Sequence, residues 1–243
     1  MAHKQNTTRK AALVTGAGKR MGSAIARMLA EEGYDIALHC HTSMKEAKAT
    51  ADAIRKCGVR CEVFTADLRK GGYQTLMQKV FKTFPNLTLL INNASLFERK
   101  AFMETTEADY DANMAVHLKA PLFLTQEFSR KVKKGQVLNI VDTYVTKTTP
   151  AYFAYLLSKK ALYEFTRMAA RALSPNIRVN AVAPGTTLQS KDMSAQHRKK
   201  KEATLPMAAL IEFNDVVEAV RFIINQPKIT GECLFVDSGE QLL

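Results

Sequence analysis

The chain has 243 residues, with 35 Lys and Arg against 23 Asp and Glu, which gives a formal charge of +12 and fits one basic α/β domain with a large core. It has no run of about 18 apolar residues, and residues 1–10 are too polar for a signal segment, so we expect a cytoplasmic protein that does not contact membranes. The basic clusters at 130–134 and 198–201 are not interleaved with aromatic residues, so we expect solvated surfaces there and no nucleic-acid site.

Short apolar runs alternate with longer segments of helical periodicity along the whole chain. In chain order we expect a strand at 11–16, a helix at 21–32, a strand at 35–41, a helix at 43–57, a strand at 61–67, a helix at 73–84, a strand at 87–95, a helix through 109–118 and on towards 130, a strand at 137–141, a helix at 154–173, a strand at 177–185, a helix at 214–225 and a strand at 232–237. Almost wholly apolar strands, each followed by a helix, indicate a parallel sheet covered on both faces. Right-handed crossovers then give a doubly wound sheet, a Rossmann fold, in one domain over residues 1–243. Such sheets bind ligands beyond the carboxyl ends of their strands, where the motifs below all fall.

A glycine-rich turn, VTGAGKRMG, follows the first strand and opens the first helix. Gly16, Gly18 and Gly22 have the spacing that lets a backbone approach a pyrophosphate, and the helix N-terminus adds N–H donors. Lys19 and Arg20 lie inside the turn and suit a phosphorylated ligand. The turn therefore predicts a dinucleotide cofactor.

The end of the second strand, HCHTS, favours NADP(H) over NAD(H). An NAD-binding chain usually has an acid about 20 residues beyond the glycines, which holds the ribose 2′-hydroxyl. Here His41, Thr42 and Ser43 can donate hydrogen bonds to a 2′-phosphate, which a carboxylate would repel. Asp67, after the third strand, is either an adenine contact or a helix cap, and we leave both alternatives open.

Tyr155 and Lys159 lie four residues apart near the start of the helix at 154–173, so their side chains share one face. A nearby ammonium favours the phenolate, so we expect a Tyr155 pKa lowered toward neutrality. Tyr155 would then act as a general acid–base, and Lys159 would also bind the nicotinamide ribose. Thirteen residues before Tyr155, the strand at 137–141 ends on an acid, Asp142.

Four motifs, TGAGKRMG, NNAS, YLLSK and NAVAPG, together resemble the short-chain dehydrogenase/reductase family over about residues 10–237. The resemblance implies that Tyr155 is the proton donor, that Lys159 is its helper, and that the protein is a homotetramer. It also places NNAS and the PG pair of the last motif beside the nicotinamide. The expected cofactor-binding residues are Gly16, Lys19, Arg20, Met21, Gly22, His41, Thr42, Ser43, Asp67, Leu68, Asn93, Ala94, Ser95, Tyr155, Lys159, Pro184 and Gly185.

Two residues depart from the family pattern: the family usually has Ser where this chain has Asp142, and Asn where it has His117. His117 either orients Lys159 through water, as the Asn does, or is a core histidine. The Asp, together with NNASLF, resembles the pteridine reductases and the bacterial dihydropterin reductases, which implies that Phe97 stacks on a pterin. Those pteridine reductases usually carry Arg where this chain has Thr42. The expected substrate-binding residues are Arg20, Ser95, Phe97, Asp142 and Tyr155.

The chemistry of a reduced pterin gives a reason for a carboxyl group at position 142. A ketone presents one oxygen, for which a hydroxyl suffices, whereas a reduced pterin presents a C=N bond, ring N–H groups and an amino group. A carboxylate accepts hydrogen bonds from those donors; alternatively, a carboxyl whose pKa is raised by burial helps Tyr155 deliver a proton to the ring nitrogen. Simple capping at the strand end is a third alternative.

These observations predict an NADPH-dependent reductase of dihydropterin or dihydrofolate-type substrates, with the catalytic residues Asp142, Tyr155, Lys159 and His117. The alternative is a short-chain carbonyl reductase of the 3-oxoacyl-carrier-protein or quinone type. A non-catalytic NADP-sensing or nucleic-acid-binding protein is a third hypothesis, but it leaves the Tyr/Lys pair unexplained.

The polar segment 186–208 is expected to form a loop or lid on the substrate side. The four cysteines lack metal-ligand and disulfide spacing, so we expect reduced thiols and no metal site.

Overall fold

The computed structural model describes residues 9–188 and 194–243, over which strands and helices alternate as predicted. The strands are β1 (Ala11–Val14), β2 (Asp35–Cys40), β3 (Cys61–Thr65), β4 (Leu87–Asn92), β5 (Gly135–Ile140), β6 (Ile177–Pro184) and β7 (Cys233–Val236). The α-helices are α1 (Arg20–Glu31), α2 (Met44–Arg55), α3 (Tyr73–Thr83), α4 (Glu107–Met114), α5 (Ala120–Lys131), α6 (Phe153–Leu173), α7 (Ala195–Thr204) and α8 (Phe213–Asn225). None of the helices in these ranges is long and apolar enough to cross a membrane.

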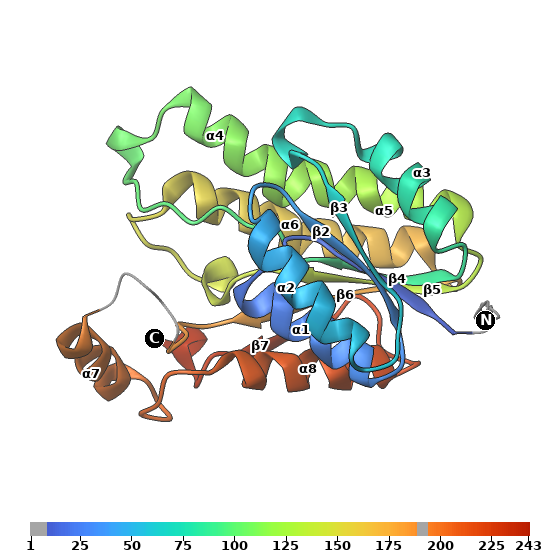
Figure 1. Cartoon of the computed structure of the whole chain (residues 1–243). Coiled ribbons are helices and arrows are strands. Elements are labelled where there is room, and N and C mark those ends of the chain that lie inside the picture. Colours follow the sequence, from blue (N-terminus) through green and yellow to red (C-terminus); the bar gives the residue numbers. More distant parts are fainter. Residues whose placement is uncertain (1–8, 189–193) are drawn as a thin grey trace.

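The strands of the described chain form one parallel sheet in the order β3-β2-β1-β4-β5-β6-β7 (Figure 1). The chain first builds outward from β1 to β3 and then returns to place β4 on the other side of β1. The prediction of a doubly wound α/β sheet is therefore confirmed. At this reversal the carboxyl ends of β1 and β4 lie side by side and leave a crevice for a ligand.

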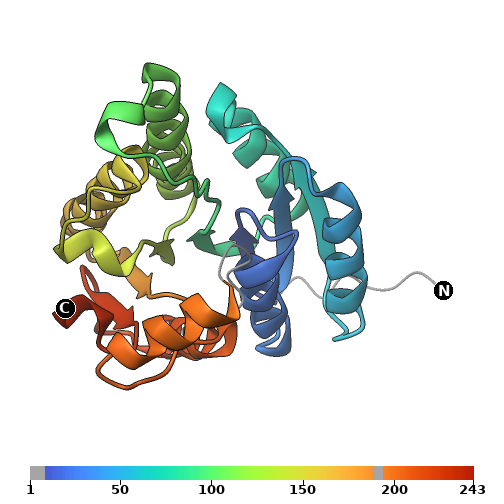
Figure 2. The ribbon, with the colours of Figure 1, turned by 90° about the vertical axis from the view of Figure 1, so that its left-hand side faces the viewer.

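Helices cover both faces of the sheet, which nearly all-apolar parallel strands require. α1, α2 and α8 pack on one face, and α3, α5 and α6 pack on the other (Figure 2). Ile25 and Leu29, four residues apart on α1, are fully buried in the first layer. Phe84 and Phe128 are fully buried in the second. The helical periodicity of the sequence thus corresponds to the faces that the helices turn toward the sheet.

The helix expected from 109 towards 130 is interrupted in the structure. A π-helical turn, η3 (Ala115–Lys119), separates α4 from α5. Pro121 lacks an N–H, so the carbonyl of His117, four residues earlier, cannot accept the hydrogen bond of a regular α-helix. The wider turn carries His117 at a position where its side chain is buried.

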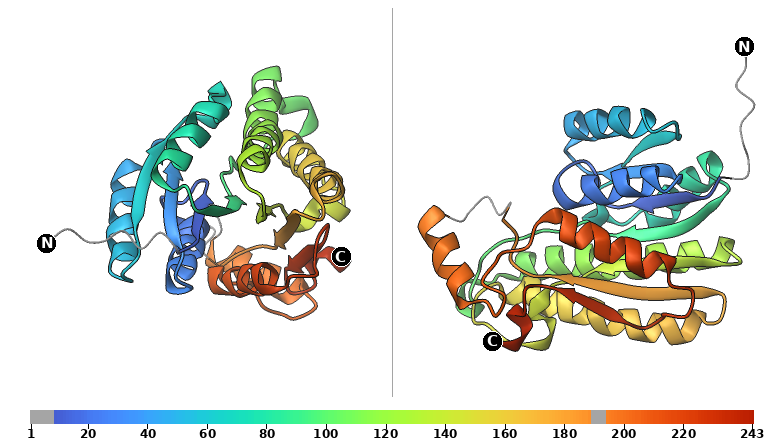
Figure 3. Two further views of the ribbon diagram at one scale, coloured as in Figure 1. Left: turned by 90° about the vertical axis from the view of Figure 1, so that its right-hand side faces the viewer. Right: turned by 90° about the horizontal axis from the view of Figure 1, so that it is seen from below.

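The segment predicted as a lid, residues 186–208, contains the helix α7, and its residues 189–193 lie outside the described residues. α7 is polar and has no buried residue. It stands at one end of the molecule, near the end of the chain (Figure 3). Contacts of polar side chains, and not burial of apolar ones, therefore attach α7 to the rest of the protein.

Candidate active site

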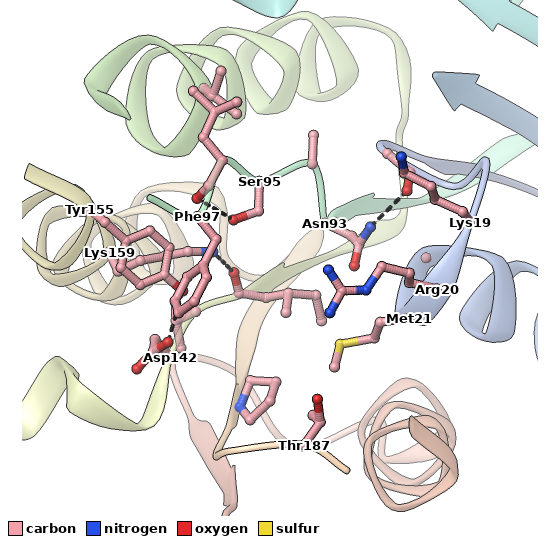
Figure 4. A pocket seen from close by; sticks show the side chains of 18 of the residues that line it. Lys19, Arg20, Met21, Asn93, Ser95, Phe97, Asp142, Tyr155, Lys159 and Thr187 are labelled. Carbon is pink, nitrogen blue, oxygen red and sulfur yellow. Dashed lines mark hydrogen bonds between the residues drawn. The ribbon is translucent and has the colours of Figure 1, made fainter. Parts of the chain in front are cut away.

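A cavity of about 850 Å³ opens where the strands end, and it is lined by every predicted site residue except His117. Lys19, Arg20 and Met21 lie at one side of the cavity, and Phe97, Asp142, Tyr155 and Lys159 lie at the other (Figure 4). Asn93 and Ser95 lie between these two groups. Motifs that are far apart in the sequence thus meet in one cavity, which has one end rich in cations and one end that holds the Tyr/Lys pair.

The glycine turn is in close contact with the NNAS segment. Gly16 has a φ of +64°, and a Cβ built on it would lie 2.8 Å from the Cα of Ala94. Thr15, which the sequence did not single out, joins the two segments: its hydroxyl accepts hydrogen bonds from the backbone N–H of Asn93 at 2.9 Å and of Ala94 at 3.0 Å. In the sequence, the signal for this role of Thr15 is a hydroxyl-bearing residue directly before the glycine turn. The turn is held against β4 in a shape that admits no side chain at Gly16 and leaves its backbone facing the cavity.

His39, at the end of β2, fastens the same turn from the other side. The backbone N–H of Gly16 donates to its Nδ1 at 3.3 Å, and its Nε2 donates to the carbonyl of Ala66 at 3.2 Å. Burial lowers the pKa of His39 to about 4, so the ring is neutral at physiological pH, as these two hydrogen bonds require. His39 therefore has a structural role, although it lines the cavity together with His41, Thr42 and Ser43.

Asp67 caps the short helix η1 (Leu68–Lys70) by accepting from the backbone N–H of Arg69 at 3.1 Å. The Arg69 guanidinium also donates to both carboxylate oxygens at 2.9 Å, and these side-chain hydrogen bonds lower the pKa of Asp67 to about 2. The structure thus shows the helix cap, and because Asp67 also lines the cavity, the adenine contact stays a prediction. Arg69 also lines the cavity, and it adds a cation there that the sequence reasoning missed.

At the other end of the cavity, Tyr155 and Asp142 are joined by a hydrogen bond. The Tyr155 hydroxyl donates to Oδ2 of Asp142 at 2.7 Å, and the backbone N–H of Tyr144 donates to Oδ1 at 2.8 Å. Asp142 also caps the short helix η4 (Thr143–Thr146). The same side chain is therefore both a helix cap and a part of the site. Lys159 is 2% exposed, and its ammonium donates to the carbonyl of Ile140 at 2.7 Å.

The expectation that Lys159 lowers the Tyr155 pKa is wrong for this arrangement. Burial, and then the charge of Asp142 and its hydrogen bond, raise the pKa of Tyr155 well above its ordinary value. The Lys159 ammonium is 5.8 Å from the Tyr155 ring centroid, whereas the carboxylate is in direct contact with the hydroxyl. Burial raises the pKa of Asp142 and lowers that of Lys159 to about 8. Tyr155 and Asp142 therefore titrate as a pair that holds its proton tightly.

His117 lies behind the cavity wall. Its Nε2 accepts from the backbone N–H of Leu96 at 3.0 Å, and its Nδ1 donates to the Ser158 hydroxyl at 2.9 Å. Burial lowers the pKa of His117 well below its ordinary range, which agrees with this neutral tautomer. Ser158 in turn donates to the backbone carbonyl of Tyr155 at 2.6 Å. These contacts fit the core-histidine alternative, because His117 braces α6 against the loop after β4. The link from His117 to Lys159 through water stays a prediction.

Phe97 lies at the rim of the cavity, where its side chain is 55% exposed. It stacks on Tyr152 with ring centroids 4.8 Å apart and meets the ring of Tyr155 edge-on at 5.0 Å. Tyr152, which the sequence reasoning missed, has a φ of +58°, a costly conformation for a side chain of this size. The result is an aromatic wall beside the Tyr155 ring.

A doubly wound sheet with a glycine turn at its reversal point and a Tyr/Lys pair across the same cavity defines a dinucleotide-dependent oxidoreductase. The family model for short chain dehydrogenases matches residues 10–202, and the chain belongs to that family. An uncharacterized oxidoreductase of Thermotoga maritima is 31% identical over 95% of this chain and 96% of its own length. A 3-oxoacyl-acyl-carrier-protein reductase, FabG, of Staphylococcus epidermidis is 29% identical over 95% of this chain and 98% of its own length.

Solved structures extend the comparison. FolM alternative dihydrofolate reductase 1 from Brucella canis, complexed with NADP, matches with a TM-score of 0.91 and 36% identity, covering 96% of this chain and 94% of that one. A short chain dehydrogenase from Burkholderia cenocepacia in complex with NADP matches with a TM-score of 0.89 and 28% identity, covering 95% and 97%. Both NADP complexes therefore share the fold over nearly the full chain.

Replacing Gly16 by Ala should weaken NADPH binding about tenfold or more, because the new methyl group overlaps the backbone of Ala94 and displaces the turn. Gly33→Ala is the matched control, since Gly33 also has a positive φ but no atom within 4 Å of its Cβ position. Fluorescence titration with NADPH measures both variants. An equal loss of affinity in both would show that backbone strain, and not the contact with Ala94, is responsible.

Replacing Tyr155 by Phe should lower kcat by a factor of about 100 to 10,000, because the hydroxyl that donates to Asp142 is lost. NADPH affinity should change little, since the ring and its packing remain. Tyr152→Phe is the control, because it removes a hydroxyl from the tyrosine stacked on Phe97 and leaves the pair with Asp142 intact. Single-turnover kinetics would contradict the assignment if the Tyr155 variant retained the wild-type rate.

Proposed function

We propose that this protein is an NADPH-dependent reductase of dihydropterin or dihydrofolate-type substrates, with Tyr155 as its proton donor. The observation that carries the proposal is the hydrogen bond from Tyr155 to Asp142 inside the cavity. A carboxyl group in that place accepts hydrogen bonds from the ring N–H and amino groups of a pterin, or passes a proton toward its ring nitrogen. The similarity to the FolM alternative dihydrofolate reductase of Brucella canis supports the same substrate class.

The cofactor is NADP(H), as predicted from the sequence. When bound, it supplies the hydride. The turn at Gly16 offers its backbone to the pyrophosphate, next to the N-terminus of α1. His41, Thr42 and Ser43 line the cavity where an NAD-specific chain would place a carboxylate, so the wall there suits a 2′-phosphate. Arg69 lies on the same wall, where its guanidinium is paired with the Asp67 carboxylate.

Tyr155 gives its proton to the nitrogen of a C=N bond while the adjacent carbon receives the hydride, so the bond is reduced by one hydride and one proton. Lys159, whose ammonium is held on the carbonyl of Ile140 and lies 5.8 Å from the Tyr155 ring centroid, is left to bind the nicotinamide ribose. Asp142 is in contact with that oxygen and returns a proton to it. Because burial raises its pKa, Asp142 can hold this proton nearer to neutral pH than an exposed carboxyl could.

Phe97 and Tyr152 provide the apolar side of the substrate end. Their stacked rings leave Phe97 partly exposed, so a planar heterocycle that enters the cavity can cover the exposed face. The edge-on contact between Phe97 and Tyr155 places that face beside the proposed proton donor. The aromatic wall thus supports a flat substrate whose reducible bond lies near the Tyr155 hydroxyl.

A carbonyl reductase of the 3-oxoacyl-carrier-protein type is the second candidate, because FabG of Staphylococcus epidermidis aligns over nearly the whole chain. Asp142 argues against it. A ketone has no N–H groups from which a carboxyl could accept, so it gives no reason for a carboxyl where a hydroxyl would suffice. The homotetramer and the cytoplasmic location that we expect from the sequence stay predictions.

NADPH oxidation should be fastest with a reduced pterin or folate when dihydrobiopterin, dihydromonapterin, dihydrofolate and a 3-ketoacyl substrate are assayed in parallel. The reason is that only the first three carry the N–H donors and the C=N bond that Asp142 and Tyr155 are arranged to meet. The kcat/KM for each substrate is the measurement. A higher kcat/KM on the 3-ketoacyl substrate would overturn the proposal in favour of the second candidate.

Replacing Asp142 by Ser should lower kcat/KM on the preferred pterin by about a hundredfold or more.

Wild-type kcat/KM should also fall as the pH rises through the raised Asp142 pKa, because the carboxyl then loses the proton that it passes to Tyr155. Asp142→Asn cannot lose a proton and should lack this alkaline limb. Full activity of the Ser variant, or the same limb in the Asn variant, would refute the role of the carboxyl.

A further inference from the structure

Glu240 is a fully buried carboxylate that the proposed chemistry does not use. It lies in η5 (Glu240–Leu242), just after β7. Lys201 of α7 pairs with its Oε1 at 2.7 Å, and the Tyr144 hydroxyl donates to the same oxygen at 3.1 Å. The backbone N–H of Thr186 donates to Oε2 at 2.9 Å. One side chain thus binds three segments that meet at the substrate end of the cavity.

These partners account for a charge that would otherwise be costly to bury. Removing a carboxylate from water without partners is strongly unfavourable, and an ion pair with additional hydrogen bonds compensates for the loss. Burial alone would raise the pKa of Glu240, but the hydrogen bonds from Lys201 and Thr186 bring it below its ordinary value. Glu240 is therefore ionised at neutral pH and attracts the Lys201 ammonium.

Helix α7 is not attached by a buried apolar face. It has no buried residue, and its sequence, AQHRKKKEAT, has no apolar stripe. The chain becomes buried at Leu205, just after the helix, and Pro206 packs on Gly239. Within α7, Lys201 is the residue that lines the cavity, and its side chain is 26% exposed although it is a lysine on a polar helix. The ion pair with Glu240 is thus an anchor inside the helix itself.

The same carboxylate is close to the other parts of the site. A Cβ built on Gly185 would lie 2.9 Å from Oε2 of Glu240, so the loop after β6 packs directly on it. Tyr144, which donates its hydroxyl to Glu240, also donates its backbone N–H to Asp142. A displacement of Glu240 would therefore reach the helix α7, the loop of Gly185 and the turn that holds Asp142.

We infer that Glu240 is a positioning residue that holds α7, through Lys201, against the substrate end of the cavity and thereby sets substrate affinity. This inference rests on the proposed function, because it assigns the wall of the same site. It gives Lys201 a role distinct from that of the other cations of the helix: Lys201 binds the protein's own carboxylate, and so it is occupied before any substrate arrives.

The test compares Lys201→Met with Lys200→Met, which removes an exposed charge from the same helix. In the full-length protein saturated with NADPH, hydrogen exchange of the amides in 195–204 should become about tenfold faster in Lys201→Met and stay unchanged in Lys200→Met. The substrate KM should rise about tenfold in Lys201→Met with little change in kcat or NADPH affinity. Lys201→Arg, which can still pair with Glu240, should restore both values.

Glu240→Gln supplies the partner test, since in that background Lys201→Met should have no further effect on hydrogen exchange. The inference would be overturned if hydrogen exchange were unchanged in Lys201→Met, or if Lys200→Met had an equal effect. It would also be overturned if Lys201→Met accelerated exchange as much in the Glu240→Gln variant as in the wild type. The exchange measurement needs no substrate. If no pterin or folate is turned over, the proposed function fails while the role of Glu240 is still decided.

Discussion

The hydrogen bond between Tyr155 and Asp142 is the interaction on which the rest of the site depends. A carboxyl group at the end of a buried strand needs donors, and it obtains them from the Tyr155 hydroxyl and the backbone of Tyr144. The first donor fixes where α6 begins relative to β5, and the second fixes the turn η4. Lys159, on the same helix face as Tyr155, then reaches the carbonyl of Ile140 at the end of the same strand. The positions of the proton donor, the acid and the ammonium thus follow from a single buried contact.

The fold could be predicted because parallel strands that are buried on both faces leave a strong mark in the sequence. Runs such as AALV, which became β1, are apolar throughout, and helices such as α1 show buried residues at four-residue spacing. The cavity could be predicted for a related reason. Every motif followed a strand, and in a parallel sheet all carboxyl ends lie on one edge, so Arg20, Asn93 and Tyr155 had to lie around one cavity.

What the sequence could not predict depends on contacts between residues distant along the chain. Glu240 and Tyr144 are 96 residues apart, and no local pattern signals that they meet. The prediction of a lowered Tyr155 pKa failed because burial and the charge of Asp142 raise it. The i,i+4 spacing places Lys159 on the correct face without fixing its ammonium, which donates to a backbone carbonyl. His117 was ambiguous because its role depends on the π-helical turn. The turn has a sequence cause in Pro121, but periodicity alone does not show it.

Asp142 and Glu240 have pKa values displaced in opposite directions, although both lie at the substrate end of the site. Burial raises the Asp142 pKa, and the negative charge of Glu240 raises it further. Glu240 keeps that charge because Lys201 and Thr186 bind it. The Glu240 charge is thus a small addition to the effect of burial on the Asp142 pKa, and the paired Lys201 ammonium opposes it. Two carboxyl groups in one site can divide their roles in this way only if one of them has a cation of its own, and in this chain the helix α7 supplies it.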